Sequence, residues 1–321
     1  MKQLFSILLV FFLTSCSLNN EKQVVTDAKK HFEAGNYNDA LILLEKYSKD
    51  HDNVTSPAFW YLKGKCLQKK YNEEEQNNLQ SPSRIAGIEA FAVFLNVADD
   101  SNQAQIDSAR ENIKTLNREI YNDAAIMLTP MKYELAVSTF ELFKSISKKH
   151  GLDDDIKIVE VKFNLVLAQV YCQIYERDRT LNQSFFKKAE DTYKTIIATD
   201  SVNIAGNYNL AILYYNEAIN KIRGLECNSQ EKLAGEIDLS NPSQEIPDLK
   251  TLAECYISLD DEKKGIESLF LTALPYFENV YRMDSVNKNT LIGLSGIYFM
   301  LEDYKKSDTF SKKAERAKKQ V

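Results

Sequence analysis

The sequence predicts an all-α chain built from antiparallel helix pairs that stack side by side. The chain is 44% hydrophobic and 27% charged, yet it has only 10 glycines and 6 prolines in 321 residues, a composition that suits a folded helical protein. Residues four apart share one face of a helix, so an alanine with a large apolar residue four positions later marks a closely packed helix. Five such pairs occur: Ala40/Leu44, Ala90/Phe94, Ala136/Phe140, Ala189/Tyr193 and Ala273/Phe277.

The first fifteen residues are expected to be a cleaved signal peptide. Lys2 precedes an apolar run over residues 4–13, which is too short for a transmembrane helix of roughly 20 residues. The ending Leu13-Thr14-Ser15-Cys16 resembles the lipobox of bacterial lipoproteins, and this resemblance implies cleavage before Cys16 and lipidation of its thiol. The alternative is an ordinary secretory signal in which the cysteine is incidental.

Residues 16–22 would then form a short lipidated tether. Two or more acyl chains hold a protein on a membrane effectively permanently. The stretch 17–22 spans roughly 20 Å when fully extended, so the folded part is expected to begin close to the membrane. Ser17 after the cysteine resembles the outer-membrane sorting choice of enterobacteria. We therefore expect a lipid-anchored protein of the cell envelope, in the outer membrane, on its periplasmic face or at the cell surface.

The spacing of small residues predicts where the helix pairs lie. Within a pair, the small residue of the second helix follows that of the first by 12 positions in three cases: Ala28/Ala40, Ala124/Ala136 and Ser295/Ser307. From the second helix of one pair to the first helix of the next pair, the separation is 22 positions in two cases: Ala189/Ala211 and Ala273/Ser295. Longer intervals predict additional residues in the turns within three pairs: Gly64/Ala90, Ala168/Ala189 and Ala211/Ala273.

Turn chemistry marks some boundaries between helices. Gly35 is expected to end a helix in a left-handed conformation, and Asn36 to start the next. The tetrad DSVN, at 200–203 and 284–287, is expected each time at the end of a second helix. Pro275 falls inside a helical period, which predicts a kink. The acidic runs 73–75 and 153–155 are expected to be solvated turns.

The stretch "NYNLAILY" at 207–214 places Leu210, Ala211 and Tyr214 at the spacing L-G-x2-Y. With the alanine pairs above, this set resembles the tetratricopeptide repeat (TPR) over about 21–321, and the C-terminal part is similar to repeat proteins common in Bacteroidetes. The resemblance implies a right-handed solenoid of five full repeats and a sixth terminal pair. This solenoid would occupy residues 23–321. An insertion at about 223–262 is either a lid over the binding groove or a surface excursion.

In TPR proteins the first helix of each pair lines a concave groove that binds peptides. Tyrosine offers contact area with little loss of rotamer freedom, and amides satisfy the backbone of a bound peptide. The alternative for each tyrosine is packing against a neighbouring helix. The resemblance places these residues in the groove: Tyr61, Lys65, Tyr121, Asn122, Leu165, Gln169, Tyr208, Asn209 and Tyr215.

Several function classes lack support in the sequence. The formal net charge is −6, and the one basic cluster lies at 305–319, which argues against nucleic acid as a partner. That cluster is either the solvated face of a last helix or a contact for anionic lipid or an acidic partner. The chain has no catalytic motif, and its three histidines lack metal-ligand spacing, so we expect no enzyme, no metal and no small-molecule cofactor.

The remaining cysteines fall into two groups. Cys66 and Cys172 lie within apolar helical patterns and are expected to be buried as small hydrophobic residues. The sequence allows a disulfide between Cys227 and Cys255 but does not require one.

The sequence therefore favours a non-enzymatic, membrane-anchored adaptor or scaffold. It would bind a protein or peptide partner in an outer-membrane assembly or secretion complex. Two alternatives are a glycan-capturing lipoprotein of a polysaccharide-uptake system and a regulator of a peptidoglycan hydrolase. The single Trp60 offers little for sugar stacking, which disfavours the first alternative.

Overall fold

The computed structural model describes residues 20–51, 54–75, 78–152, 156–224 and 260–317. Over these residues the regular structure is entirely helical and contains no strand, which confirms the all-α prediction there. Among the described helices, none combines the length and the apolar character needed to cross a bilayer. The predicted signal peptide, Cys16, Cys227, Cys255 and most of the insertion expected at 223–262 lie outside the described residues.

The chain divides into two compact units, Met1–Met127 with Glu134–Ile156 and Leu128–Tyr133 with Lys157–Val321. The first unit begins with a helix over 20–33. It continues with α2 (Tyr37–Asp50), α3 (Pro57–Lys70), the π-helical turn η1 (Tyr71–Glu75), α4 (Pro82–Val97), the short 3-10 helix η2 (Asp100–Asn102), α5 (Gln103–Ile126) and α6 (Tyr133–Lys149).

Small residues in the first unit lie where the helix pairs pack. Ala28 and Ala40 are fully buried in one core cluster, as their spacing predicts. A Cβ on Gly64 of α3 would lie 2.7 Å from the ring of Phe91 on α4, so only glycine admits that ring. Gly35 has φ +81° and ends the first helix, which confirms its predicted role. Asn36 precedes α2, but its side chain makes no capping hydrogen bond.

The first unit departs from the expected pattern at α5. The small-residue spacing identifies only the part of α5 around Ala124, yet the helix begins at Gln103 and runs for 24 residues. Its N-terminal half packs on α3 and α4 through an apolar stripe that the alanine motif does not contain. The members of this stripe are Ile106, Ala109, Ile113, Leu116 and Ile120. The extension brings new polar side chains beside α3.

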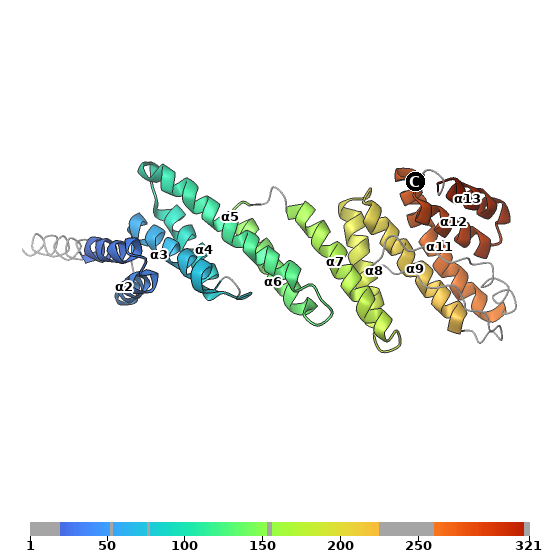
Figure 1. The fold of residues 1–321 in the computed structure, drawn as a ribbon, viewed down its shortest axis with the longest axis horizontal. Coiled ribbons are helices and arrows are strands. Elements are labelled where there is room, and N and C mark those ends of the chain that lie inside the picture. Colours follow the sequence, from blue (N-terminus) through green and yellow to red (C-terminus); the bar gives the residue numbers. More distant parts are fainter. Residues whose placement is uncertain (1–19, 52–53, 76–77, 153–155, 225–259, 318–321) are drawn as a thin grey trace, which may run out of the picture. The chain divides into compact units, whose positions relative to one another are not determined.

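The second unit contains α7 (Ile156–Arg177), α8 (Gln183–Thr199), α9 (Ile204–Gly224), α11 (Asp260–Met283), α12 (Lys288–Met300) and α13 (Tyr304–Ala317). Helix α9 is buried along most of its length and lies against α8 and α11 (Figure 1). Ala168, Ala189, Ala211 and Ala273 are all fully buried in its core cluster. Helix α11 continues as one element through Pro275.

The two DSVN tetrads occupy matching turns. Each follows a second helix, α8 or α11, as predicted. The Asn203 side chain accepts a hydrogen bond from the Gly206 amide at 2.8 Å, and the Asn287 side chain accepts one from the Thr290 amide at 2.9 Å. These asparagines satisfy amides at the starts of α9 and α12 that have no partner within the helix.

The basic cluster is only partly a solvated face. Lys305, Lys312 and Arg316 are exposed on α13. Lys306 is exposed as well, although its ammonium lies 4.6 Å from the ring centre of Tyr298, whereas Lys313 is half-buried and donates to the Tyr281 hydroxyl at 2.6 Å. Two of the lysines therefore help to hold α13 on α11 and α12, which it adjoins in Figure 1.

Candidate functional site

A hydrogen-bonded row of side chains joins α3 and α5 in the first unit. The Tyr61 hydroxyl donates to Ser108 Oγ at 3.0 Å, and Asn112 Nδ2 reaches the same oxygen at 3.5 Å. Gln68 Nε2 donates to Asn112 Oδ1 at 3.0 Å, and Lys65 Nζ donates to Gln68 Oε1 at 3.3 Å. We call these five residues the α3–α5 polar row. Two of them, Tyr61 and Lys65, are among the groove residues that the TPR resemblance implies.

The polar row is half-buried and rests on an aromatic base. The Tyr61 ring lies 5.1 Å from the ring centre of Phe94 and 6.0 Å from that of Phe91. Burial lowers the pKa of Lys65 below the usual lysine value, and the charge of Lys69 lowers it further. The row therefore offers an ammonium group, amides and hydroxyls in fixed positions beside apolar rings. Such a surface can satisfy the backbone and one acidic or apolar side chain of a peptide.

The sequence pattern did not predict three members of the polar row. Gln68 lies on α3 about one turn after Lys65, at a position that the repeat assigns to the groove, and Ser108 and Asn112 lie on the unexpected N-terminal half of α5. A signal for this half exists, because its apolar residues alternate at spacings of three and four, the period of an amphipathic helix. That period predicts a helix, but it does not specify which neighbouring helix the predicted one packs against.

The predicted groove residues farther along α5 lie apart from this row. The Tyr121 ring packs on Phe140 and Phe143 of α6, with ring centres 6.2 and 5.5 Å away. Asn122 is exposed and donates to Glu119 of the same helix at 3.3 Å. Tyr121 therefore takes the packing role that was the alternative for the tyrosines.

In the second unit the predicted residues are half-buried or buried. Leu165 and Tyr208 are half-buried against one core cluster, and Gln169 is half-buried on α7. The Tyr208 ring stands edge-on to Phe277, and burial raises the pKa of its hydroxyl to about 12. Asn209 is only 8% exposed.

Tyr215 is a correction to the predicted groove. It is 1% exposed, and its ring packs edge-on against Phe270 and Phe277 of α11. The position follows the apolar face of α9, so the ring belongs to the core. The sequence pattern could not exclude this, since tyrosine suits either a core or a groove.

Tyrosine hydroxyls and carboxylates form a second set of contacts in this unit. Tyr175 donates to Glu217 at 2.5 Å, Tyr214 to Glu190 at 2.5 Å, and Tyr298 to Glu278 at 2.7 Å. Burial raises the pKa of Glu190, but hydrogen bonds from Lys194, Tyr214 and Lys187 outweigh this effect and lower the pKa to about 2. Each pair ties one helix to its neighbour.

The long turn between α3 and α4 is held by buried polar groups. Glu75 accepts hydrogen bonds from Ser81 Oγ at 2.7 Å and from Ser83 Oγ at 2.9 Å, so this member of the acidic run is an anchor and not a solvated turn residue. Arg84, at the start of α4, is paired with Asp123 of α5 at 2.5 Å. Burial raises the pKa of Asp123, although Arg84 opposes the rise.

The cysteines in the described part of the chain lie in the core. Cys66 and Cys172 are both buried free thiols, as predicted, and burial raises the pKa of each to about 12. Neither is a thiolate at neutral pH, so neither is positioned for nucleophilic chemistry. Over the described residues, no three His, Cys, Asp or Glu side chains gather as metal ligands do.

Comparison with known proteins adds no family. No protein-family model matches the chain, and no curated protein matches it.

Proposed function

We propose that this protein is a lipid-anchored, non-enzymatic adaptor of the bacterial cell envelope that binds a protein or peptide partner through the first helices of TPR-like pairs. Five full pairs and a sixth terminal pair would form a right-handed solenoid, attached to the outer membrane through Cys16. The partner would belong to an outer-membrane assembly or secretion complex.

The α3–α5 polar row is the observation that carries this proposal. In TPR proteins the first helices of successive pairs line the groove, and α3 and α5 hold those places in the repeat pattern. Here their side chains are fixed by contacts between the helices before any partner arrives. Side chains that are already ordered lose little conformational entropy on binding, which favours affinity.

The close packing of small residues supports the helical-pair architecture. Ser295 on α12 donates to the Ser307 carbonyl on α13 at 3.0 Å, twelve residues away along the chain. Ala124 and Ala136 have the same separation and are both fully buried. Pairs that recur in this way leave an apolar flank, and stacking is how repeat proteins bury it.

The anchoring part of the proposal rests on the sequence around Cys16. The mass of the mature amino terminus tests it directly, because an acylated cysteine as the first residue is expected. A Cys16→Ser variant should then move from the membrane fraction to the soluble fraction. An unmodified amino terminus would reject the anchor and leave the groove proposal standing.

Site-specific photo-crosslinking tests partner binding. A benzophenone amino acid is placed at Lys65 in the polar row or, as a control, at Lys46, which is exposed on α2 outside the row. Crosslinking in intact cells is expected to give a discrete protein adduct from position 65 and none from position 46. Equal adducts from both positions, or none, would contradict a groove on α3 and α5.

The same experiment separates the alternatives. A peptidoglycan hydrolase in the adduct would favour the regulator. Retention of the protein on polysaccharide, without a protein adduct, would favour glycan capture. Trp60, the single tryptophan, argues against the latter, because its indole donates to the Val54 carbonyl at 3.0 Å and its ring packs on Phe59.

A further inference from the structure

The α3–α5 polar row has a direction, which its lysine sets. An ammonium group can only donate, so the bond from Lys65 Nζ at 3.3 Å requires the oxygen of the Gln68 amide on that side. The Gln68 nitrogen then faces Asn112 Oδ1 at 3.0 Å, and the Asn112 nitrogen faces Ser108 Oγ at 3.5 Å. The Tyr61 hydroxyl donates to the same Ser108 oxygen at 3.0 Å. Each amide oxygen of the row therefore accepts a hydrogen bond from within the row.

The groups that remain for a partner are mainly donors. An ammonium has three N–H groups and a side-chain amide has two. Lys65, Gln68 and Asn112 each use one of these within the row, so each keeps at least one for a partner. The Ser108 hydroxyl accepts two of the bonds and keeps its own hydrogen. A ligand group with acceptor atoms only, such as a carboxylate or a backbone carbonyl, matches these donors.

Lys65 differs from the other lysines of α3 in its surroundings. Among the described residues, Lys65 forms no ion pair, and its one hydrogen bond goes to the neutral Gln68 amide. The other three lysines of this helix each lie near a carboxylate: Lys63 near Glu45, Lys69 near Glu73 and Lys70 near Glu75. The polar row therefore contains a half-buried positive charge that lacks a counter-ion.

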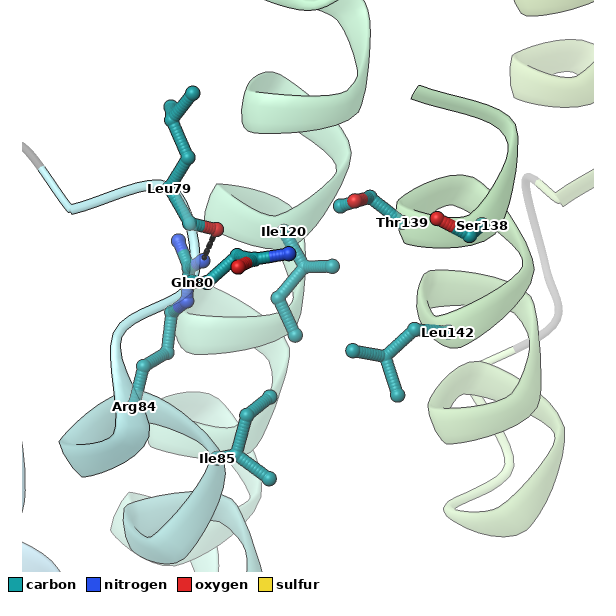
Figure 2. A pocket seen from close by; sticks show the side chains of 8 residues that line it. All are labelled: Leu79, Gln80, Arg84, Ile85, Ile120, Ser138, Thr139 and Leu142. Carbon is teal, nitrogen blue, oxygen red and sulfur yellow. Dashed lines mark hydrogen bonds between the residues drawn. The ribbon is translucent and has the colours of Figure 1, made fainter. Parts of the chain in front are cut away.

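The buried cation of α4 is satisfied in a different way. Figure 2 shows the hydrogen bond from Arg84 to the Leu79 carbonyl, which is 2.8 Å long. The same guanidinium pairs with Asp123 of α5 at 2.5 Å. Arg84 thus finds its negative partner within the first unit, whereas the charge of Lys65 stays unpaired.

The acidic residues on the N-terminal and middle turns of α5 do not supply this partner. Asp107 and Glu119 accept hydrogen bonds from other residues of α5, and Glu111 is exposed. The charge that acts on Lys65 is that of Lys69, which is also positive. A carboxylate that approached Lys65 would therefore meet a positive local charge.

We propose that the α3–α5 polar row binds an acidic side chain, Asp or Glu, in an extended segment of the partner protein. The inference rests on the proposed adaptor function and names the chemistry that this part of the groove selects. The carboxylate pairs with Lys65, and a neighbouring backbone carbonyl accepts from Asn112 and Ser108. The segment is extended because the carbonyls of a helix are already hydrogen-bonded. Partial burial strengthens the pairing, since less water screens the two charges.

In-cell crosslinking from Thr115 tests the role of the charge. Thr115 is exposed on α5, three residues after Asn112, so it lies on the same side of the helix. Lys65→Gln keeps a donor for Gln68 but removes the charge, and it should lower the yield of the partner adduct about tenfold. Lys65→Arg should retain most of the yield. Lys46→Gln, at an exposed position on α2, is the control and should leave the yield unchanged.

Blocked amino acids test the preference for an acidic side chain directly. N-acetylglutamate N-methylamide and N-acetylglutamine N-methylamide match in size and differ in charge. The full chain in mild detergent, with nitrogen-15 in its side-chain amides, is titrated with each at pH 7.5 and followed by NMR. The glutamate probe should shift the Gln68 and Asn112 signals with a Kd of about 1–10 mM, as suits so small a ligand. The glutamine probe should bind about tenfold more weakly.

The outcomes separate this inference from the proposed function. The absence of an adduct from Thr115 in every variant would reject the adaptor function and the acidic segment together. Equal adduct yields from Lys65→Gln and Lys46→Gln would leave the adaptor function standing and overturn the acidic segment. Equal shifts with the two blocked probes would also overturn it. Tighter binding of N-acetylalanine than of the glutamate probe would do the same, because the row would then take a chain end.

Discussion

In the first unit, a buried ion pair and a buried amide contact join α4, α5 and α6 beside an apolar core, whereas in the second unit aromatic rings join the helices around α9. Arg84 pairs with Asp123, and Asn117 donates to Ser147 Oγ at 2.8 Å, both across helices of the first unit. In the second unit Tyr215 packs on Phe270 and Phe277. Among the described residues, the buried apolar side chains form two clusters in the first unit and one in the second.

This difference indicates how each unit responds to change. A buried polar contact needs both partners, since the loss of one leaves the other desolvated and unpaired. A substitution in an aromatic core removes part of the contact area and leaves no unpaired charge. The first unit should therefore be the more sensitive to single polar substitutions, and the second to changes in side-chain volume. Trp60 lies in the first unit, so its fluorescence can report on that unit separately.

The largest effect is expected from Arg84→Ala. It leaves Asp123 buried without a partner and should lower the free energy of unfolding of the first unit by about 3–5 kcal/mol. Denaturant unfolding followed by Trp60 fluorescence measures this loss. The control is Arg84→Met with Asp123→Leu, which removes both charges and should recover most of the stability. A single variant as stable as the double variant would show that the ion pair is not the basis of the difference between the units.

Glycine substitutions test tight packing in both units. A Cβ on Gly64 would lie 2.7 Å from Phe91, and one on Gly293 would lie 2.7 Å from Phe277. Gly64→Ala and Gly293→Ala should each cost about 1–3 kcal/mol through overpacking. Only Gly64→Ala should move the Trp60 transition.

Gly265→Ala is the matched control for these two changes. Gly265 lies on α11 with nothing within 4 Å of an added Cβ, so alanine should stabilise this helix by about 0.5–1 kcal/mol. Equal effects at the three glycines would show that helix propensity, and not close approach of the rings, decides the outcome.

Acid pH tests the tyrosine–carboxylate contacts of the second unit. Glu190 has its pKa lowered from 4.5 to about 2 in the folded protein. Its contribution to stability is therefore complete above pH 4.5 and is lost as the pH falls toward 2. Glu190→Gln should cost about 1–2 kcal/mol at pH 7 after solvent screening is allowed for, and less at pH 3.

Asp191→Asn is the control for Glu190→Gln. The Asp191 side chain is 59% exposed, against 12% for Glu190, and both contact Lys187. An exposed pair of this kind contributes about 0–1 kcal/mol, so the control should change stability little. A larger loss in Asp191→Asn than in Glu190→Gln, measured by chemical unfolding, would contradict the role given to Glu190.

The smallest effects are expected at the helix starts. Asn287→Ala removes the hydrogen bond to the Thr290 amide and should cost about 1 kcal/mol. Asn36→Ala in the first unit should cost a few tenths of a kcal/mol, because its side chain makes no such bond. Thermal unfolding of both variants checks this difference, and a larger loss at Asn36 would reject the capping argument.

Local features of this chain could be predicted well. Gly35 adopts the positive φ expected of a helix-ending glycine, and the buried positions of Ala28, Ala40, Cys66 and Cys172 follow from their helical patterns. The second tetrad, at 284–287, lies in the predicted turn. These features depend on a few neighbouring residues, so the sequence contains the information needed.

The candidate site could be predicted only in part. Tyr61 and Lys65 lie in the polar row, but Tyr215 lies in the core. Their residue types are compatible with either place, since tyrosine and lysine both carry a long apolar part and a polar end. Which end meets solvent depends on the neighbouring helix, and the repeat pattern does not specify that helix at each position.

The sequence by itself determined that this chain forms helices, where many of them turn, and which small residues lie at their contacts, because periodicity and turn chemistry act over short distances. Only the tertiary structure decided which polar groups are buried together. Arg84 of α4 meets Asp123 near the end of α5, and Gln68 meets Asn112 because α5 begins earlier than the repeat spacing implies and so reaches α3. Such pairings depend on the packing of whole helices, and a polar residue carries no local mark of the partner that it will find.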